Sequence, residues 1–154
     1  MSAKRPMSAL AAGLAQSLVA LGACAGEINE SGGVAIKGYD PVAYFQEKKP
    51  VRGDERFRLE YQGSTFLFSS VANRDLFAAN AEKFAPQYGG YCAFGASRGY
   101  KADVDPAAFA IVGDRLYLNY NAKVQQDWLK DPSRYIQQAD ERWPDVKVTE
   151  KVFR

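Results

Sequence analysis

The stretch RFRLEYQGSTFLFSS, residues 56–70, alternates apolar and charged side chains up to a Gln62-Gly63 pair and resumes an apolar pattern beyond it. A period of two is typical of a half-buried strand, and a glycine-containing pair between two such runs is typical of a tight turn. The stretch therefore predicts a β-hairpin. A second stretch, FAIVGDRLYLNY at residues 109–120, repeats the pattern around Gly113-Asp114 and predicts a second hairpin.

Helical segments alternate with these hairpins. Residues 69–87 follow the first hairpin with a helical pattern for which Ser70 is a suitable cap, and Asn121 is placed to cap another helix after the second hairpin. Asp131-Pro132 predicts a further helix start, because aspartate accepts bonds from free helix amides and proline needs no donor in the first turn. The fold class predicted is α+β: a small single domain with antiparallel β-hairpins packed against several short helices.

Two other Asp-Pro pairs punctuate the chain. Asp40-Pro41 is expected to open a short helical turn, whereas Asp105-Pro106 is followed so soon by apolar residues that it is expected to run into a strand. Asp105 is nevertheless interpreted as a capping residue, which makes the nearby Asp103 and Asp105 a poor calcium-binding pattern.

Length and charge limit the classes of protein that fit this sequence. A chain of 154 residues, of which 47% are hydrophobic, suits one globular domain with a core of ordinary size. The 20 basic and 18 acidic residues give a net charge of only +2. This balance argues against a nucleic-acid-binding protein, which usually carries a clear basic excess.

The first 25 residues have the layout of an export signal: Lys4 and Arg5, an uncharged run from Met7 to about Ala20, then small residues up to Ala25. The segment LGAC, residues 21–24, also resembles a bacterial lipobox, so Cys24 is a candidate for lipidation. We expect the protein to be exported to the periplasm or the outer face of a bacterial membrane. Contact with a membrane is expected only through this anchor or an uncleaved signal.

The chain is thus divided into four segments by its composition. After the signal at residues 1–25 we expect a linker at 26–35, which is polar and ends in Gly32-Gly33. The folded domain is expected at 36–145, and a charged, loosely held polar tail at 146–154.

Four motifs occur in a particular order: GYDPVAYF (38–45), YQGSTFLFSSVANRDLF (61–77), APQYGGYCAFG (85–95) and LYLNYN (116–121). Together they resemble the YHS-domain family, and more closely its secreted bacterial branch. The resemblance implies a small α+β domain often found beside or fused to proteins that handle heavy metals. In the metal-linked members cysteines occupy positions where this chain has Ala43, Ser69 and Asn73, and those departures argue against metal binding.

Cys92 is the one cysteine of the processed domain, which also has no histidine and no methionine. Soft and borderline metal ions prefer thiolate, imidazole or thioether ligands, and a closed zinc site usually needs four of them. The sequence leaves the cofactor unknown; a soft metal ion is one candidate, and it would have to bind Cys92 together with oxygen ligands or across two subunits.

Cys92 admits two other interpretations. As a nucleophile it would need a base or cation to lower its pKa, and Arg98 and Lys101 are the nearest cations in the sequence. As a structural residue it would pack like a small hydrophobe, which its neighbours Tyr91 and Phe94 favour. We favour the packed interpretation and predict no catalytic residue.

The function predicted from these features is a secreted or lipid-anchored, non-enzymatic YHS-like domain that binds a small molecule or metal ion. Two alternatives remain: a thiol-centred enzyme that uses Cys92, and a protein-interaction module of the cell envelope with no small ligand. Tyrosine combines an apolar ring with a polar tip, as ligand pockets require. The predicted ligand-binding residues are Cys92, Tyr44, Tyr91, Asp40, Ser69 and Asn73, with Cys92 as the metal ligand.

Overall fold

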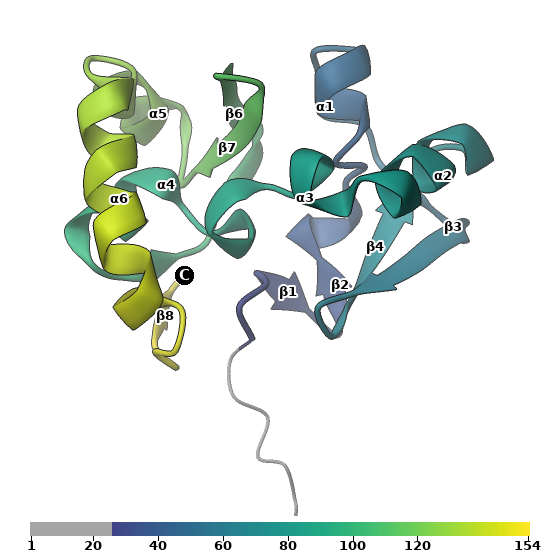
Figure 1. The fold of residues 1–154 in the computed structure, drawn as a ribbon, viewed down its shortest axis with the longest axis horizontal. Coiled ribbons are helices and arrows are strands. Elements are labelled where there is room, and N and C mark those ends of the chain that lie inside the picture. Colours follow the sequence, from purple (N-terminus) through teal and green to yellow (C-terminus); the bar gives the residue numbers. More distant parts are fainter. Residues whose placement is uncertain (1–25) are drawn as a thin grey trace, which may run out of the picture.

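The computed structural model describes residues 26–154, which form two halves side by side (Figure 1). The first half is a four-stranded sheet of order β1-β2-β4-β3. Its strands are β1 (Glu30–Ser31), β2 (Val34–Ala35), β3 (Asp54–Tyr61) and β4 (Ser64–Phe68). Strands β3 and β4 are the first predicted hairpin, antiparallel and joined by Gln62 and Gly63, which both have positive φ.

Helices α1 (Ala43–Gln46), α2 (Val71–Ala79) and α3 (Ala81–Phe84) complete this half, together with a short 3-10 turn at Ile36–Gly38. Ser70 caps α2 as predicted, since the Asn73 amide donates to its Oγ at 3.1 Å. The predicted helix is interrupted at Asn80, whose side chain caps α3 by accepting from the Lys83 amide at 3.3 Å. A side chain that competes with the backbone in this way favours a break over helix continuation.

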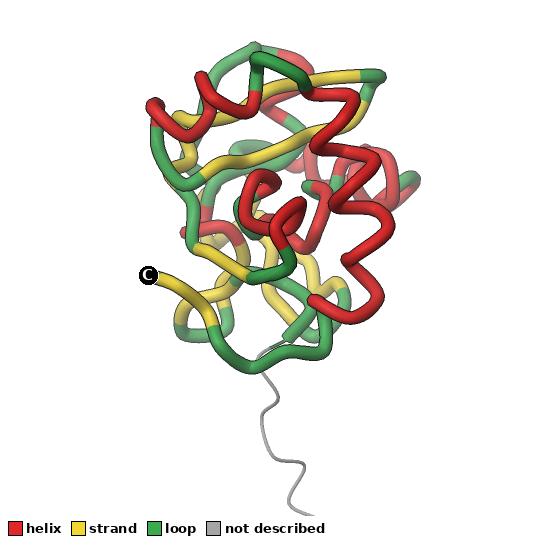
Figure 2. The backbone as a smooth tube through the Cα atoms, turned by 90° about the vertical axis from the view of Figure 1, so that its left-hand side faces the viewer, coloured by secondary structure: helices red, strands yellow, loops and turns green. Residues whose placement is uncertain are grey.

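The second half contains the second predicted hairpin, β6 (Asp105–Val112) and β7 (Arg115–Asn119), and the helices α4 (Ala93–Arg98), α5 (Ala122–Trp128) and α6 (Pro132–Val146). Asn121 and Asp131 cap α5 and α6 as predicted. Asp105 begins β6 and caps no helix, although its carboxylate accepts from the Ala107 amide at 2.9 Å. Figure 2 shows α6 as the longest red segment, with strands and loops around it. The α+β class is confirmed.

Each half has a buried cluster, and the hairpin β6–β7 contributes to both. Leu116 and Leu118 belong to the same buried cluster as Phe66 and Phe68 of β4, whereas Tyr117, on the opposite face of β7, packs on Trp128 of α5. Successive strand residues point to opposite faces, so a single strand can hold two layers together. The α4 helix begins at Ala93, with Cys92 as its N-cap, after the 3-10 turn at Gln87–Gly90.

The segment predicted as a linker is part of the fold. Ile28 and Asn29 are buried, and the Asn29 amide donates to the Gly89 carbonyl oxygen at 2.8 Å. Residues 26–29, here called the strap, therefore lie across Gly89 and Gly90 before β1 and β2 join the sheet. Strands of two residues have no sequence period, which is why a polar Gly-Gly segment resembles a linker.

The segment predicted as a loose tail is also ordered by pairing. α6 continues through Pro144 to Val146, and β8 (Val152–Phe153) then pairs in parallel with β5 (Lys101–Ala102). The predicted export signal and Cys24 lie outside the described residues. Within residues 26–154 no helix is long and apolar enough to cross a membrane.

Candidate functional site

Asp40 is completely buried, and its carboxylate organises the first half. Its Oδ1 accepts from the amides of Val42 at 2.8 Å and Ala43 at 3.2 Å, at the start of α1. Its Oδ2 accepts at 2.8 Å each from the amide and hydroxyl of Ser69 and from Nδ2 of Asn73. The structure thus brings together three of the predicted site residues, Asp40, Ser69 and Asn73.

The hydrogen bonds of Asp40, Ser69 and Asn73, a cluster that we call the Asp40 joint, serve to hold elements of the fold together. A carboxylate offers about four lone-pair positions, and the five donors around Asp40 occupy both oxygens. The bonds connect the start of α1 to the end of β4 and the first turn of α2. The cluster therefore positions these elements and presents no free acceptor to a ligand.

Tyr44 is likewise enclosed. Its side chain is fully buried, its ring lies 4.9 Å from that of Phe109, and its hydroxyl donates to the Pro106 carbonyl oxygen at 2.8 Å. Burial, together with the nearby Tyr39, Asp105 and Asp40, raises the pKa of the Tyr44 phenol. Tyr44 thus connects α1 to β6 across the two halves.

Cys92 is 2% exposed and caps α4 with its sulfur, which accepts from the Gly95 amide at 3.4 Å. Its thiol faces Asn119 Oδ1 at 3.6 Å, and its amide donates to the Ala102 carbonyl oxygen at 2.9 Å. Burial raises the pKa of the Cys92 thiol, although backbone amides oppose this shift. The packing interpretation of Cys92 agrees with this environment, because reactive cysteines are partly exposed and have lowered pKa values.

We predict that iodoacetamide modifies Cys92 at least about a hundredfold more slowly in the folded chain than in the urea-unfolded chain at pH 8.5. A raised pKa leaves less thiolate below that pKa, and burial denies access to what remains. A Cys24→Ser chain isolates the signal of Cys92, which is read by mass spectrometry. Equal rates in the folded and unfolded chain would contradict the prediction and restore the thiol-centred alternative.

The metal hypothesis gains no support from the arrangement of ligands. Within residues 26–154 no three cysteine, aspartate or glutamate side chains gather so that they could hold a metal ion. The donors next to Cys92 are an amide oxygen and backbone N–H groups, and the thiol is protonated more readily than an exposed one.

Tyr91, the last predicted ligand residue, holds the strap. Its hydroxyl lies 3.2 Å from the Gly26 carbonyl oxygen and 3.3 Å from that of Ile28, and its side chain is 2% exposed. The ammonium of Lys101 lies 5.0 Å from its ring. The predicted site residues therefore do not surround one open pocket: three form the Asp40 joint, and the others are buried at separate places.

Open space lies elsewhere, around Arg115 at the start of β7. Three surface depressions, of about 670, 270 and 390 Å³, are all lined by this residue. The largest lies between the β6–β7 turn and α6, where Tyr117 and Ile136 contribute apolar surface and Asp140 and Glu141 contribute carboxylates. We call this depression the Arg115 groove.

The electrostatics of the groove are mixed. The guanidinium of Arg115 is exposed, and no side chain of residues 26–154 forms an ion pair or hydrogen bond with it. On the α6 wall Asp140 Oδ1 accepts at 2.8 Å from the hydroxyl of Tyr88, a residue that lines the third depression and not the groove itself. Burial is the main cause that raises the pKa of both the Tyr88 and Tyr117 phenols; Asp140 adds to it and Arg115 opposes it.

Sequence reasoning missed Arg115 and Asp140. Tyr88 and Tyr117 lie in two of the quoted motifs, but 25 positions separate Arg115 from Asp140 and no spacing connects them. The nearest signal is the predicted turn at Gly113-Asp114, which places Arg115 at the exposed end of a hairpin.

Comparison with known proteins identifies a family for the first half of the molecule. The model of the YHS domain family matches residues 42–88, which run from α1 to the turn that carries Tyr88. Neither the curated proteins nor the solved structures include a significant match. The match covers the Ser69 and Asn73 side of the Asp40 joint and one wall of the third depression, whereas Arg115 and Asp140 lie beyond it.

Proposed function

We propose that this chain, which carries a YHS domain at residues 42–88, is a non-enzymatic domain that binds a small molecule in the Arg115 groove. In this proposal the protein acts outside the cytoplasm, after export directed by the first 25 residues. The observation that carries the proposal is the exposed guanidinium of Arg115, which has no ion-pair partner in the described chain and lies where three depressions meet.

The two walls of the groove favour a ligand with both charges. A guanidinium binds a carboxylate through paired hydrogen bonds, and such charge-assisted bonds are among the strongest in proteins. Asp140 and Glu141 lie on the α6 wall and would accept an ammonium group. Tyr117 and Ile136 supply apolar surface for the body of the ligand. A small zwitterion, with an amine and a carboxylate on an apolar spacer, fits this arrangement.

The non-enzymatic part of the proposal rests on the titratable groups of the groove. A general acid or base works best with a pKa near the operating pH. Burial raises the pKa of the Tyr117 phenol in the groove, and that of the Tyr88 phenol beside it, away from neutrality. These groups are suited to orient and hold a ligand.

The small-molecule alternative is preferred to the metal alternative because of Cys92. A soft metal ion would need its thiolate, which is 2% exposed and lies beside a carbonyl oxygen of Asn119. The groove needs no rearrangement of the core to admit a ligand.

The test is a titration of the full chain, followed by NMR of backbone amides, with 6-aminohexanoate, hexanoate and hexylammonium as probes. We expect 6-aminohexanoate to shift the amides of Arg115, Tyr117 and Gln137. Each probe that lacks one charge should bind about tenfold more weakly or worse, which corresponds to about 1.4 kcal/mol.

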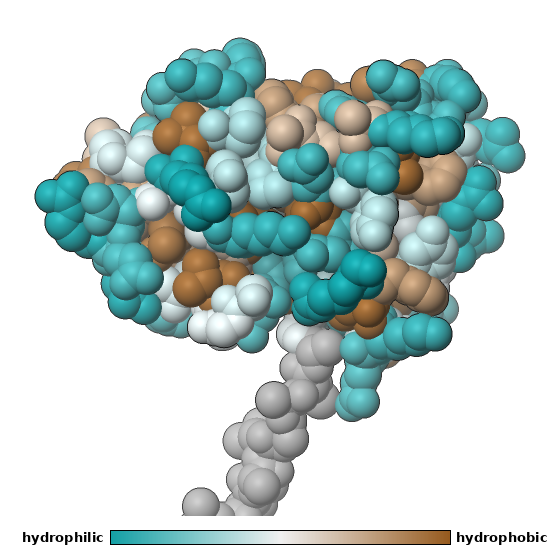
Figure 3. Space-filling view, turned by 180° about the vertical axis from the view of Figure 1, so that it is seen from behind, coloured by the Kyte–Doolittle hydropathy of each residue, from teal (hydrophilic) through white to brown (hydrophobic). Residues whose placement is uncertain are grey.

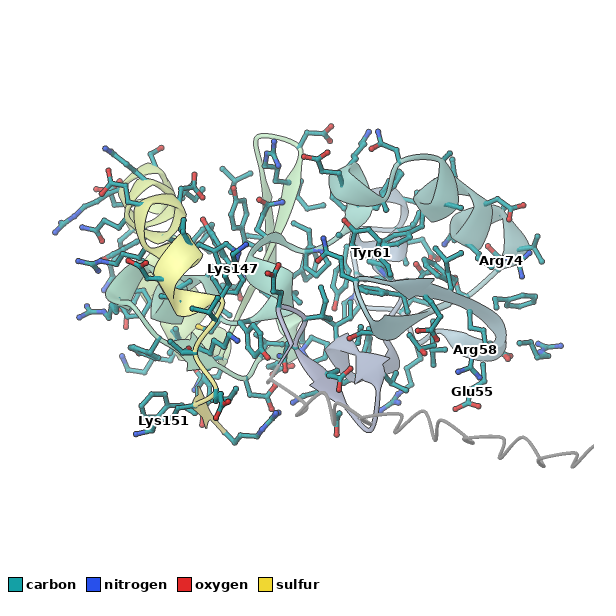
Figure 4. All side chains as sticks on the ribbon, turned by 60° about the horizontal axis from the view of Figure 1, so that its bottom comes forward. Glu55, Arg58, Tyr61, Arg74, Lys147 and Lys151 are labelled. Carbon is teal, nitrogen blue, oxygen red and sulfur yellow. The ribbon has the colours of Figure 1, made fainter. Side chains whose placement is uncertain are left out.

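Arg115→Gln should reduce the affinity for 6-aminohexanoate by about tenfold to a hundredfold, because a hydrogen bond to a charged group contributes about 1.5–3 kcal/mol. Arg58→Gln is the matched control, since Arg58 is also an arginine without an ion pair within residues 26–154 but lies on β3, far from the groove (Figure 4). Equal losses of affinity in the Arg115→Gln and Arg58→Gln variants, or amide shifts confined to residues outside the groove, would refute the proposal.

A further inference from the structure

The start of the described chain is tied to the segment that follows α6. The ammonium of Lys101 donates to the carbonyl oxygens of Lys147 and Thr149 at 2.8 Å each and to that of Gly26 at 3.4 Å. Three oxygens from opposite ends of the described chain thus surround one nitrogen. Gly26 therefore lies beside the residues that connect α6 to β8. Figure 1 shows the start of the described chain and β8 at the bottom of the molecule.

Several contacts fix the position of the strap, residues 26–29, on this face. The Tyr91 hydroxyl lies within hydrogen-bond distance of the carbonyl oxygens of Gly26 and Ile28. Glu27 forms an ion pair with Lys147 at 3.3 Å, and the Asn29 amide donates to the Gly89 carbonyl oxygen. Whatever precedes Gly26 in the chain therefore starts from a fixed position on this face.

The same face carries exposed apolar and basic side chains. Val148 is 72% exposed and Phe153 is 46% exposed. The ring of Phe153 lies 5.0 Å from that of Tyr100, itself an exposed residue, and the Lys151 ammonium lies 4.7 Å from the Phe153 ring. We call these residues, Tyr100, Val148, Lys151 and Phe153, the C-terminal patch.

Two views support this description. Figure 4, seen from below, places Lys147 and Lys151 on the C-terminal ribbon, in the other half of the molecule from Arg58 and Arg74. Figure 3 shows hydrophobic and hydrophilic side chains next to each other around the start of the described chain. A surface of this composition matches the boundary between lipid headgroups and acyl chains, where aromatic rings lie and lysine extends its charge towards water.

We propose that the C-terminal patch rests on the surface of an anionic phospholipid bilayer. The reason is the short distance along the chain between this face and the predicted lipidation site, because only one residue separates Cys24 from Gly26. Two residues of chain span about 7 Å at most, so a lipid on Cys24 would hold this face against the membrane. An uncleaved apolar run at residues 7–20 would bring the same face near the bilayer.

Charge supports the choice of an anionic surface. Residues 147–154 contain three basic side chains and one acidic side chain; Lys147 pairs with Glu27 and Arg154 with Asp103, whereas Lys151 has no ion-pair partner within residues 26–154. Juxtamembrane basic groups are attracted to anionic headgroups, and a single lipid chain needs such a second contact for stable anchoring. The patch is independent of the Arg115 groove, because no residue of the patch lines that groove.

The test uses the full chain with Cys24→Ser and Val148→Cys, labelled with the environment-sensitive fluorophore NBD and mixed with vesicles of 70% phosphatidylcholine and 30% phosphatidylglycerol. We expect a blue shift and at least about a twofold rise in emission, as for a probe that leaves water. Leu129→Cys in the same background is the matched control, since Leu129 is 46% exposed on the loop after α5. Its emission should not change. The Cys24→Ser parent shows that buried Cys92 stays unlabelled.

A second pair of variants measures affinity by co-sedimentation. Lys151→Glu should reduce the fraction of chain bound to these vesicles at least threefold, whereas Lys49→Glu, the same charge change near α1 at the opposite end, should leave it unchanged. The proposal fails if the chain sediments with vesicles while position 148 behaves like position 129, or if the chain does not bind. It also fails if the emission at 148 depends on protein concentration without vesicles, which would mean that two copies of the chain pair through this patch.

Discussion

Replacement of Asp40 by alanine is expected to lower the free energy of unfolding by about 3–5 kcal/mol. The substitution removes the acceptor for five donors: the amides of Val42, Ala43 and Ser69, the Ser69 hydroxyl and the Asn73 side-chain amide. A buried donor without a partner costs about 1–3 kcal/mol, and the completely buried site gives water no access to replace the lost bonds. Urea denaturation followed by circular dichroism measures the effect.

Asp131→Ala is the matched control for this prediction. Asp131 also caps a helix, but it is exposed and accepts from one backbone amide, that of Arg134 at 3.2 Å. Its loss should cost about 1 kcal/mol. Asp40→Asn, which keeps one acceptor oxygen, should lie between the two. If Asp40→Ala cost no more than Asp131→Ala, the Asp40 joint would not hold the first half together.

Replacement of Gly89 by alanine is expected to detach the strap and to lower the free energy of unfolding by about 3 kcal/mol or more. A Cβ at this position would lie 1.6 Å from the Glu27 carbonyl oxygen, a distance that backbone atoms cannot tolerate. Gly89 also has a φ of +62°, which costs a residue with a side chain about 1–2 kcal/mol. Hydrogen exchange should show faster exchange of the Asn29 amide, which donates to the Gly89 carbonyl oxygen.

Gly63→Ala is the control that separates the steric clash with the strap from the cost of a positive φ. Gly63 has a φ of +80° in the β3–β4 turn, and a Cβ there would meet no atom within 4 Å. This variant should therefore lose only the conformational part, about 1–2 kcal/mol, and leave the Asn29 amide protected. Equal losses for Gly89→Ala and Gly63→Ala, with Asn29 protected in both, would show that the strap is not held against Gly89.

Local signals were sufficient for most of the regular structure. The hairpins β3–β4 and β6–β7 follow from alternating side chains around Gln62-Gly63 and Gly113-Asp114, and both turns have the positive φ values that such pairs favour. The caps at Ser70, Asn121 and Asp131 were equally predictable, because an N-cap depends on a side chain and on amides two or three residues away.

The candidate site depended on contacts that no local signal reports. Asp40, Ser69 and Asn73 could be singled out from the sequence, but only the fold shows that one carboxylate binds the other two side chains and has no acceptor left for a ligand. Cys92 could be described as packed or reactive until its 2% exposure was known. Arg115 and Asp140 face one groove only because β7 and α6 both pack on α4.

By itself the sequence determined the α+β class, the two hairpins and the capped helices, since these depend on residue type and spacing over a few positions. Only the tertiary structure decided that the polar segment 26–29 is a strap and that 152–153 is a strand. Each is held by partners about 50 or more residues away, at Gly89, Tyr91 and Lys101. Such segments bury few apolar groups of their own, so hydrogen bonds hold them in place. The partners in those hydrogen bonds are distant in sequence and come near only when the core has formed.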